Sequence, residues 1–232
     1  MQEQIEKFME DQKKLKVLLL KKDSFQEGIS ACAKQHRQLH SSDLIVDRPT
    51  IWDSLVDGLT SECFSFRPEG MFESIAWCTW HITRIEDAIG NILIADDRQV
   101  FDNDWKKRIG IEITDTANAF HEPDIDRFNR SIRINEMLFY RKAVGEKTQM
   151  IINRIVASDI RKKPKENSIR RIIDEGVLTD KKESIWLKEF WSKKTIGGLL
   201  LLPITRHQMM HIPTCFLIKN IYYKDRPTTI ST

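Results

Sequence analysis

Hydrophobic residues recur every three or four positions along most of the chain, which is the spacing of one face of an α-helix. No Asn-Gly or Asp-Gly turn separates two alternating apolar and polar segments, so hairpin signals are missing. The pattern predicts an all-α protein with long helices near 24–40, 72–95, 131–157 and 195–222. Long connections between the last three favour a four-helix bundle with crossovers and extra short helices.

The remaining segments divide around these helices. Residues 1–23 are expected to form a charged N-terminal helical extension, and residues 24–222 to form one bundle domain. The domain carries insertions at 96–123 and 158–190, and polar residues in 223–232 predict a disordered tail. Further expectations are loops at 41–50 and 161–166 and a helix break near Ser131.

Three histidines lie on apolar helix faces. His207 and His211 are four residues apart, so both rings occupy one face of the last helix, about one turn apart. His81 is the strongly polar member of an apolar stripe in the helix near 72–95. A buried imidazole nitrogen needs a partner, and a divalent metal ion held by histidines from two helices is one such partner. A hydrogen-bonded core histidine is the ordinary alternative for His81 taken alone.

Two motifs resemble one known family. The segment Ser74–Asp87 looks like the second-helix motif of the DinB-like (YfiT-like) metal-dependent superfamily of bacterial four-helix bundles. The segment Trp191–Leu200, followed by the HxxxH motif, is similar to the fourth helix of that family. The resemblance extends in order over about residues 25–220. It implies that His81, His207 and His211 are the metal ligands of a histidine triad.

The chain departs from that family in two ways. Pro203 and Pro213 fall inside the last helix and should kink or interrupt it. The chain is also longer than a minimal member, and its insertions could cap the pocket. The substrate therefore does not follow from the resemblance.

Three neutral imidazoles leave a fourth metal position open to water, thiolate or substrate. Zinc or nickel is the expected ion, with iron or manganese as alternatives. Because the family includes thiol-cofactor S-transferases and a thiol-dependent isomerase, the resemblance implies a transferase that joins a low-molecular-weight thiol to a small-molecule substrate. A hydrolase using metal-bound hydroxide, and a non-catalytic metal- or ligand-binding or dimerisation module, are the alternatives. A homodimer is compatible with each of these functions.

Three further residues lie close to the ligands in sequence. Cys78 precedes His81 by three positions and Cys215 follows His211 by four. Either thiol could close the site as a structural zinc centre, could be a small core residue, or could have a redox role. Trp77 is expected to lie in the core or at the pocket.

His36 and His40 form a second HxxxH motif, for which a partly exposed helix end is expected, with His40 at the pocket rim or behind the ligands as the alternative. For Glu86 and Asp87 we expect surface pairing, or anchoring of the helix together with Arg84.

Composition narrows the functional classes. Lys and Arg number 37 and Asp and Glu 34, which leaves a net charge of +3 and a pI near 8.6, too mild to indicate a nucleic-acid partner. The four cysteines form no CxxC motif and favour a reducing compartment. No apolar run predicts a signal peptide or a membrane span. We therefore expect a cytoplasmic protein without a membrane partner.

Overall fold

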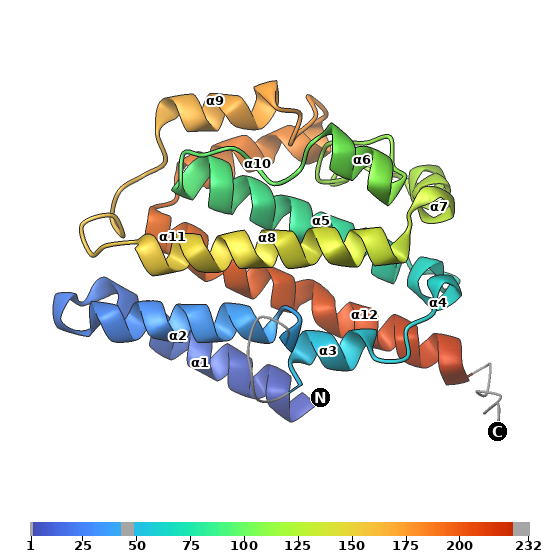
Figure 1. Cartoon of the computed structure of the whole chain (residues 1–232), viewed down its shortest axis with the longest axis horizontal. Coiled ribbons are helices and arrows are strands. Elements are labelled where there is room, and N and C mark those ends of the chain that lie inside the picture. Colours follow the sequence, from blue (N-terminus) through green and yellow to red (C-terminus); the bar gives the residue numbers. More distant parts are fainter. Residues whose placement is uncertain (1, 43–48, 225–232) are drawn as a thin grey trace.

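The computed structural model describes residues 2–42 and 49–224 (Figure 1). Within these ranges all regular structure is helical, so the all-α prediction is confirmed. Residues 43–48 of the expected loop and 225–232 of the expected tail lie outside the described residues. Residues 223 and 224, which were assigned to that tail, belong instead to the last helix.

The elements include helices in each of the four stretches predicted to be long helices, 24–40, 72–95, 131–157 and 195–222. Two of them, η3 and η4, are π-helical, and η1 is a short 3₁₀-helix. Their bounds are α1 Gln2–Leu20, η1 Lys22–Ser24, α2 Phe25–Gln38, α3 Ile51–Val56, α4 Ser61–Ser65, α5 Ile75–Asp87, η3 Ala88–Ile94, α6 Asn103–Ile109, α7 Glu122–Ser131, α8 Ile134–Arg154, α9 Glu166–Asp174, α10 Lys182–Ser192, α11 Ile196–Leu199, η4 Leu200–Arg206 and α12 His207–Lys224.

Four helices, α2, α5, α8 and α12, occupy the centre of the molecule (Figure 1). α5 packs against both α8 and α12, and α2 packs against α8 and η4. Helix α1 lies along α2, while α9 and α10 pack against each other and α9 covers η3. The two predicted histidine-bearing helices are therefore in direct contact.

Side-chain caps fix where α5 begins and where α11, which leads through η4 into α12, begins. The Ser74 hydroxyl accepts a hydrogen bond from the backbone N–H of Trp77 at 3.0 Å, and the Thr195 hydroxyl accepts one from Gly198 at 3.2 Å. Each cap satisfies an N–H group that lacks a partner within its helix. The predicted break near Ser131 falls between α7 and α8, at residues 132 and 133.

The two prolines of the last helix behave differently. Pro203 lies in the π-helical segment η4, which replaces regular α-helix immediately before His207. Proline lacks an N–H donor and clashes with the preceding turn, so a local change of hydrogen-bonding pattern is expected there. Pro213 lies inside α12, which continues to Lys224 without ending. The expected interruption at Pro213 is therefore wrong.

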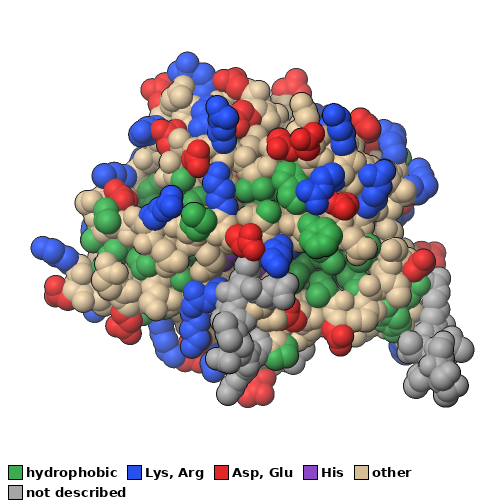
Figure 2. Space-filling model, in the orientation of Figure 1, with side chains coloured by type: hydrophobic (Ala, Val, Ile, Leu, Met, Phe, Trp, Pro, Cys, Tyr) green, Lys and Arg blue, Asp and Glu red, His purple; other side chains and the backbone are tan. Residues whose placement is uncertain are grey.

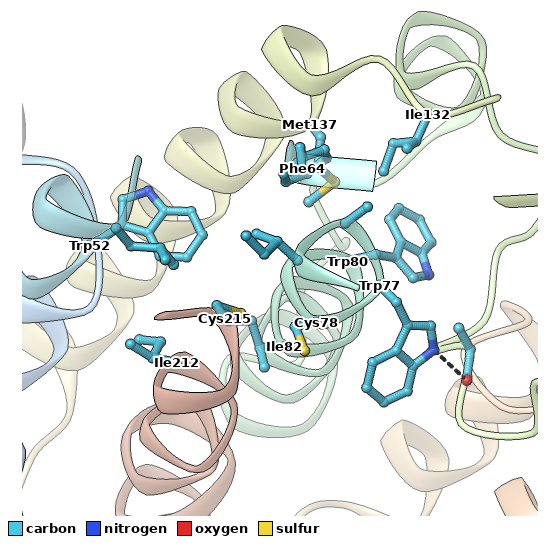
Figure 3. Packing of buried hydrophobic residues seen from close by; sticks show 14 of the residues in the cluster. Trp52, Phe64, Trp77, Cys78, Trp80, Ile82, Ile132, Met137, Ile212 and Cys215 are labelled. Carbon is cyan, nitrogen blue, oxygen red and sulfur yellow. Dashed lines mark hydrogen bonds between the residues drawn. The ribbon is translucent and has the colours of Figure 1, made fainter. Parts of the chain in front are cut away.

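Aromatic residues fill much of the core around α5 (Figure 3). Trp77 is buried, which agrees with its expected place in the core or at the pocket, and Trp80 and Trp191 are buried as well. Trp186 is 50% exposed and contacts Phe190.

Charged side chains of both signs are interspersed over the face shown in Figure 2. This distribution agrees with a solvated surface and shows no broad patch of one sign on that face. Within residues 2–42 and 49–224, no helix combines the length and the apolar character needed to cross a bilayer.

Arg84 and Asp87 are fully buried, so the expectation of surface pairing is wrong and that of anchoring holds. Their side chains form an ion pair at 3.2 Å. The Asp87 carboxylate also accepts hydrogen bonds from the Tyr140 hydroxyl and from the backbone N–H groups of Val100 and Phe101, at 2.7 to 2.8 Å. This pair therefore fixes the crossover after η3 onto α5 and α8.

We predict that Gly145→Ala destabilises the protein by about 1–3 kcal/mol. A Cβ atom at Gly145 would lie 2.5 Å from Nδ1 of the buried His40 ring, whereas one at Gly198 would meet nothing closer than 3.5 Å. Gly198→Ala is the matched control, and we expect it to be neutral or slightly stabilising because alanine favours helix. Urea denaturation of both variants measures the difference, and equal stabilities would contradict the close packing of His40.

Candidate metal centre

The structure brings together the three histidines that the sequence singled out. One ring-nitrogen ligand atom from each of His81, His207 and His211 lies within 4.8 Å of the other two. His81 projects from α5, and the other two project from the start of α12. The ring centroids are 4.8–5.1 Å apart. The donor set is three imidazoles, which is one that divalent zinc, nickel or iron accepts.

The tautomer of His81 is fixed by its neighbour. Its Nδ1 atom lies 2.8 Å from the backbone oxygen of Thr116, which can only accept a hydrogen bond. Nδ1 therefore carries the proton, and Nε2 is left with a free lone pair. Metal-ligating histidines are commonly oriented in this way by a carbonyl or carboxylate on the other ring nitrogen.

That carbonyl belongs to a longer set of contacts. Four consecutive backbone oxygens, from residues 114–117, accept hydrogen bonds from side chains of α5 at 2.8–3.1 Å. The pairs are Arg84 with Thr114, Trp80 with Asp115, His81 with Thr116, and Trp77 with Ala117. The insertion 96–123 therefore lies against the ligand helix and orients one ligand.

Ala117 adopts a left-handed backbone conformation with φ of 56°. For a residue with a Cβ atom this conformation costs roughly 1–2 kcal/mol. It is held by a 2.7 Å hydrogen bond from the Ala117 N–H to the Asp115 carboxylate and by the bond from Trp77. Backbone strain of this kind persists where surrounding contacts determine the conformation, often next to functional groups.

The spacing of the two α12 histidines fits tetrahedral coordination. Their Nε2 atoms are 3.3 Å apart. Two nitrogens bound at 2.0–2.1 Å to one tetrahedral ion are separated by about 3.3–3.4 Å. A neutral N–H···N hydrogen bond is usually shorter, near 3.0 Å. The observed spacing therefore matches two ligands of one ion better than a direct hydrogen bond.

The histidines are held in the neutral form that a metal requires. Burial lowers the pKa of His81 to about 3 and that of His211 to about 4, and burial next to the other two rings places the pKa of His207 well below its ordinary value. Trp77 stacks on His81 with centroids 4.7 Å apart and meets His211 edge-on at 5.8 Å. One side of the site is therefore an apolar aromatic wall.

Cys78 and Cys215 do not join the group of possible ligands. Both thiols are fully buried in the core between α5 and α12 (Figure 3). The pKa of Cys78 is raised well above its ordinary value by a hydrogen bond to Cys215 and by burial, so its thiol stays protonated. A closed histidine–cysteine zinc centre finds no support in this arrangement.

A second cluster lies elsewhere in the core, where a partly exposed helix end was expected. His36, His40 and Glu86 are all fully buried, which makes that expectation wrong. His36 Nε2 lies 2.6 Å from one Glu86 oxygen, and His40 Nε2 lies 2.9 Å from the other. His40 therefore contacts Glu86 and not the metal-ligand group.

In this second cluster, the histidine nitrogens that face Glu86 carry protons and so have no free lone pair for a metal ion. The amide of Gln149 has a fixed orientation, because its oxygen accepts from the Arg37 guanidinium and its nitrogen donates to the Ala33 carbonyl. The same nitrogen donates to Nδ1 of His36, so the His36 proton resides on Nε2 and is donated to Glu86. The 2.6 Å separation is also too short for two ligands of one ion. This cluster is a hydrogen-bonded network.

The network extends to residues that the sequence analysis did not identify. Glu86 also accepts a 2.6 Å hydrogen bond from Gln208, whose oxygen accepts one at 2.6 Å from Arg141. Burial favours the neutral acid, but the two histidines and their hydrogen bonds outweigh it and place the pKa of Glu86 well below its ordinary value. Burial lowers the pKa of Arg141 to about 10, which still leaves it charged at neutral pH.

Comparison with known proteins assigns neither a family nor a function to this chain. No protein-family model matches the chain, and no curated protein matches it in sequence. The functional argument therefore depends on the geometry of the two clusters.

We predict one bound divalent ion per chain. His81→Ala should weaken binding at least tenfold, because only two of the three ligands remain, whereas His36→Gln should leave the stoichiometry at one ion per chain. Elemental analysis after dialysis, together with zinc titration, measures both. Equal metal content in wild type and His81→Ala would remove His81 from the site, and two ions in the wild type would contradict the network at Glu86.

We predict that the metal-free protein loses stability on acidification below about pH 6.5. Burial lowers the pKa of His40 to about 3, so the unfolded chain binds more protons than the native state between these two values. The free energy of unfolding then falls with decreasing pH, by about 1.4 kcal/mol per pH unit for each such histidine. Glu86, with its lowered pKa, adds a loss below about pH 4.3. Denaturant melts at several pH values test this, and an unchanged slope in His40→Gln would contradict the role of His40.

Proposed function

We propose that this chain is a divalent-metal protein of the DinB-like four-helix-bundle kind that uses a low-molecular-weight thiol to modify a small-molecule substrate. The observation that carries the proposal is the set of three neutral imidazoles at His81, His207 and His211. In support of the family assignment, α2, α5, α8 and α12 are arranged with the ligands on α5 and α12, as the resemblance implies.

The charge of the site favours an anionic fourth ligand. No carboxylate belongs to the histidine group, and neutral imidazoles leave the full charge of a divalent ion uncompensated. A divalent ion at such a site would favour the thiolate form of a coordinated thiol, which is the nucleophilic form. The aromatic wall of Trp77 also suits a polarisable sulfur atom, which makes favourable contacts with rings.

The protein residues have separate tasks in this proposal. Thr116 keeps the proton of His81 on Nδ1 and thereby presents Nε2 to the ion. Trp77 excludes water from one side of the site. Zinc or nickel suits three imidazoles better than manganese, which prefers carboxylate and water ligands.

A non-catalytic metal-binding module is the second candidate. Surface cavities lie between η3 and α8, with a volume of about 700 Å³, beside α1, and between α9 and α10. None of these three is lined by a histidine of the group. His207 and His211 are half-buried, so the open metal position faces the surface on their side, and a module without turnover needs no substrate cavity there.

We predict that thiols bind the metal directly. In the cobalt-substituted protein, a low-molecular-weight thiol should produce a sulfur-to-cobalt charge-transfer band at the edge of the ultraviolet range. The Cys78→Ser/Cys215→Ser double variant should give the same band, which excludes the protein's own sulfur as its source. If millimolar thiol leaves the cobalt spectrum unchanged while acetate or phosphate alters it, hydrolysis by an activated water replaces thiol transfer. If no added ligand alters it, the non-catalytic module is favoured.

A further inference from the structure

We infer that Gln208 is a positioning residue that sets where His207 meets the metal, an inference that rests on the proposed metal function. Gln208 follows His207 directly in α12, and its side chain is fully buried. It contributes no atom to the histidine group. Its effect on the metal would pass through the backbone of α12.

The side-chain amide of Gln208 makes three hydrogen bonds. Its nitrogen donates to Glu86 at 2.6 Å and to the backbone oxygen of Ile204 at 2.8 Å, and its oxygen accepts from Arg141 at 2.6 Å. Glu86 belongs to α5, five positions after His81. The bond between Gln208 and Glu86 therefore joins the two ligand-bearing helices close to both sets of ligands.

His207 depends on such an anchor more than His81 does. Nδ1 of His81 is held by the Thr116 carbonyl, whereas Nδ1 of His207 is buried and has no hydrogen-bond partner among the described residues. Because no group hydrogen-bonds to Nδ1 of His207, no such bond sets the rotation of this ring. The position of the His207 ring therefore depends more on the position of the α12 backbone than that of His81 depends on α5.

The start of α12 also needs external support. The preceding segment η4 is π-helical and contains Pro203, which donates no backbone hydrogen bond. The Gln208 amide binds the carbonyl of Ile204 inside this segment and the fixed charge of Glu86 outside it. It therefore ties the end of the irregular segment to α5 at the residue that follows the ligand.

Cobalt titration of the 232-residue chain tests this role. In Gln208→Met the side chain keeps its length but loses all three hydrogen bonds, and we expect the Kd for cobalt to rise about 10–100-fold, as is typical when a residue behind a ligand is lost. The visible d–d bands at saturating cobalt should also change, because the His207 ring is displaced. Gln149→Met is the matched control: this glutamine serves the same network from α8 through His36 and Ala33, away from α12. Its Kd and spectrum should stay within twofold of the wild type.

The outcomes separate the two proposals. A wild type that binds no cobalt at the histidine group overturns the metal function and this role with it. A wild type that binds cobalt, with an unchanged Kd and spectrum in Gln208→Met, overturns the positioning role alone. Equal weakening in both glutamine variants also overturns it, because the effect is then a general loss of the network. If Gln208→Met does not fold, Gln208→Asn, too short to reach both Glu86 and Arg141, should weaken binding at least tenfold, and a wild-type Kd would contradict the role.

Discussion

The buried carboxylate of Glu86 constrains the arrangement of the central helices. An ionised carboxylate in the core is strongly unfavourable unless donors surround it and a counter-charge is near. The donors are His36 on α2, His40 just after the end of α2, and Gln208 on α12, while Gln208 also connects Glu86 to the cation of Arg141 on α8. Apolar packing tolerates small shifts between helices, but this set of hydrogen bonds does not. The network therefore fixes the register of α2, α5, α8 and α12.

The metal centre inherits its geometry from that register. His81 and Glu86 share α5, and His207 and Gln208 are neighbours on α12, so the contact between Glu86 and Gln208 determines how the ligand rings meet. The second constraint is the row of carbonyls at residues 114–117, which orients His81 from outside the four central helices. An insertion that the sequence suggested as a cap over the pocket thus forms part of the support of the ligand.

Helical periodicity predicted the central helices and the three histidines because both depend on local spacing along a helix face. The same reasoning failed for Glu86 because α5 is buried on every side. Glu86 lies off the apolar stripe and was therefore expected at the surface, but α5 has no exposed face. His36 gave a usable signal, since it continues the stripe of Phe25, Ile29 and Cys32 in α2. The partner of His81 could not be predicted, because a backbone carbonyl leaves no mark in the sequence and its approach depends on the tertiary path of the crossover.

The two clusters also show why close donor atoms do not by themselves identify a metal site. Each brings three metal-binding groups together, and each contains an HxxxH pair. The difference lies in the atoms behind the rings. Thr116 offers His81 only an acceptor, which moves the proton away from Nε2, whereas Gln149 offers His36 only a donor, which moves the proton onto Nε2. The first ring presents a lone pair and the second an N–H group. An ion can bind the first cluster without displacing a proton from His81, but at the second it would have to remove the proton of His36 and break the hydrogen bond that helps to keep Glu86 ionised in the core.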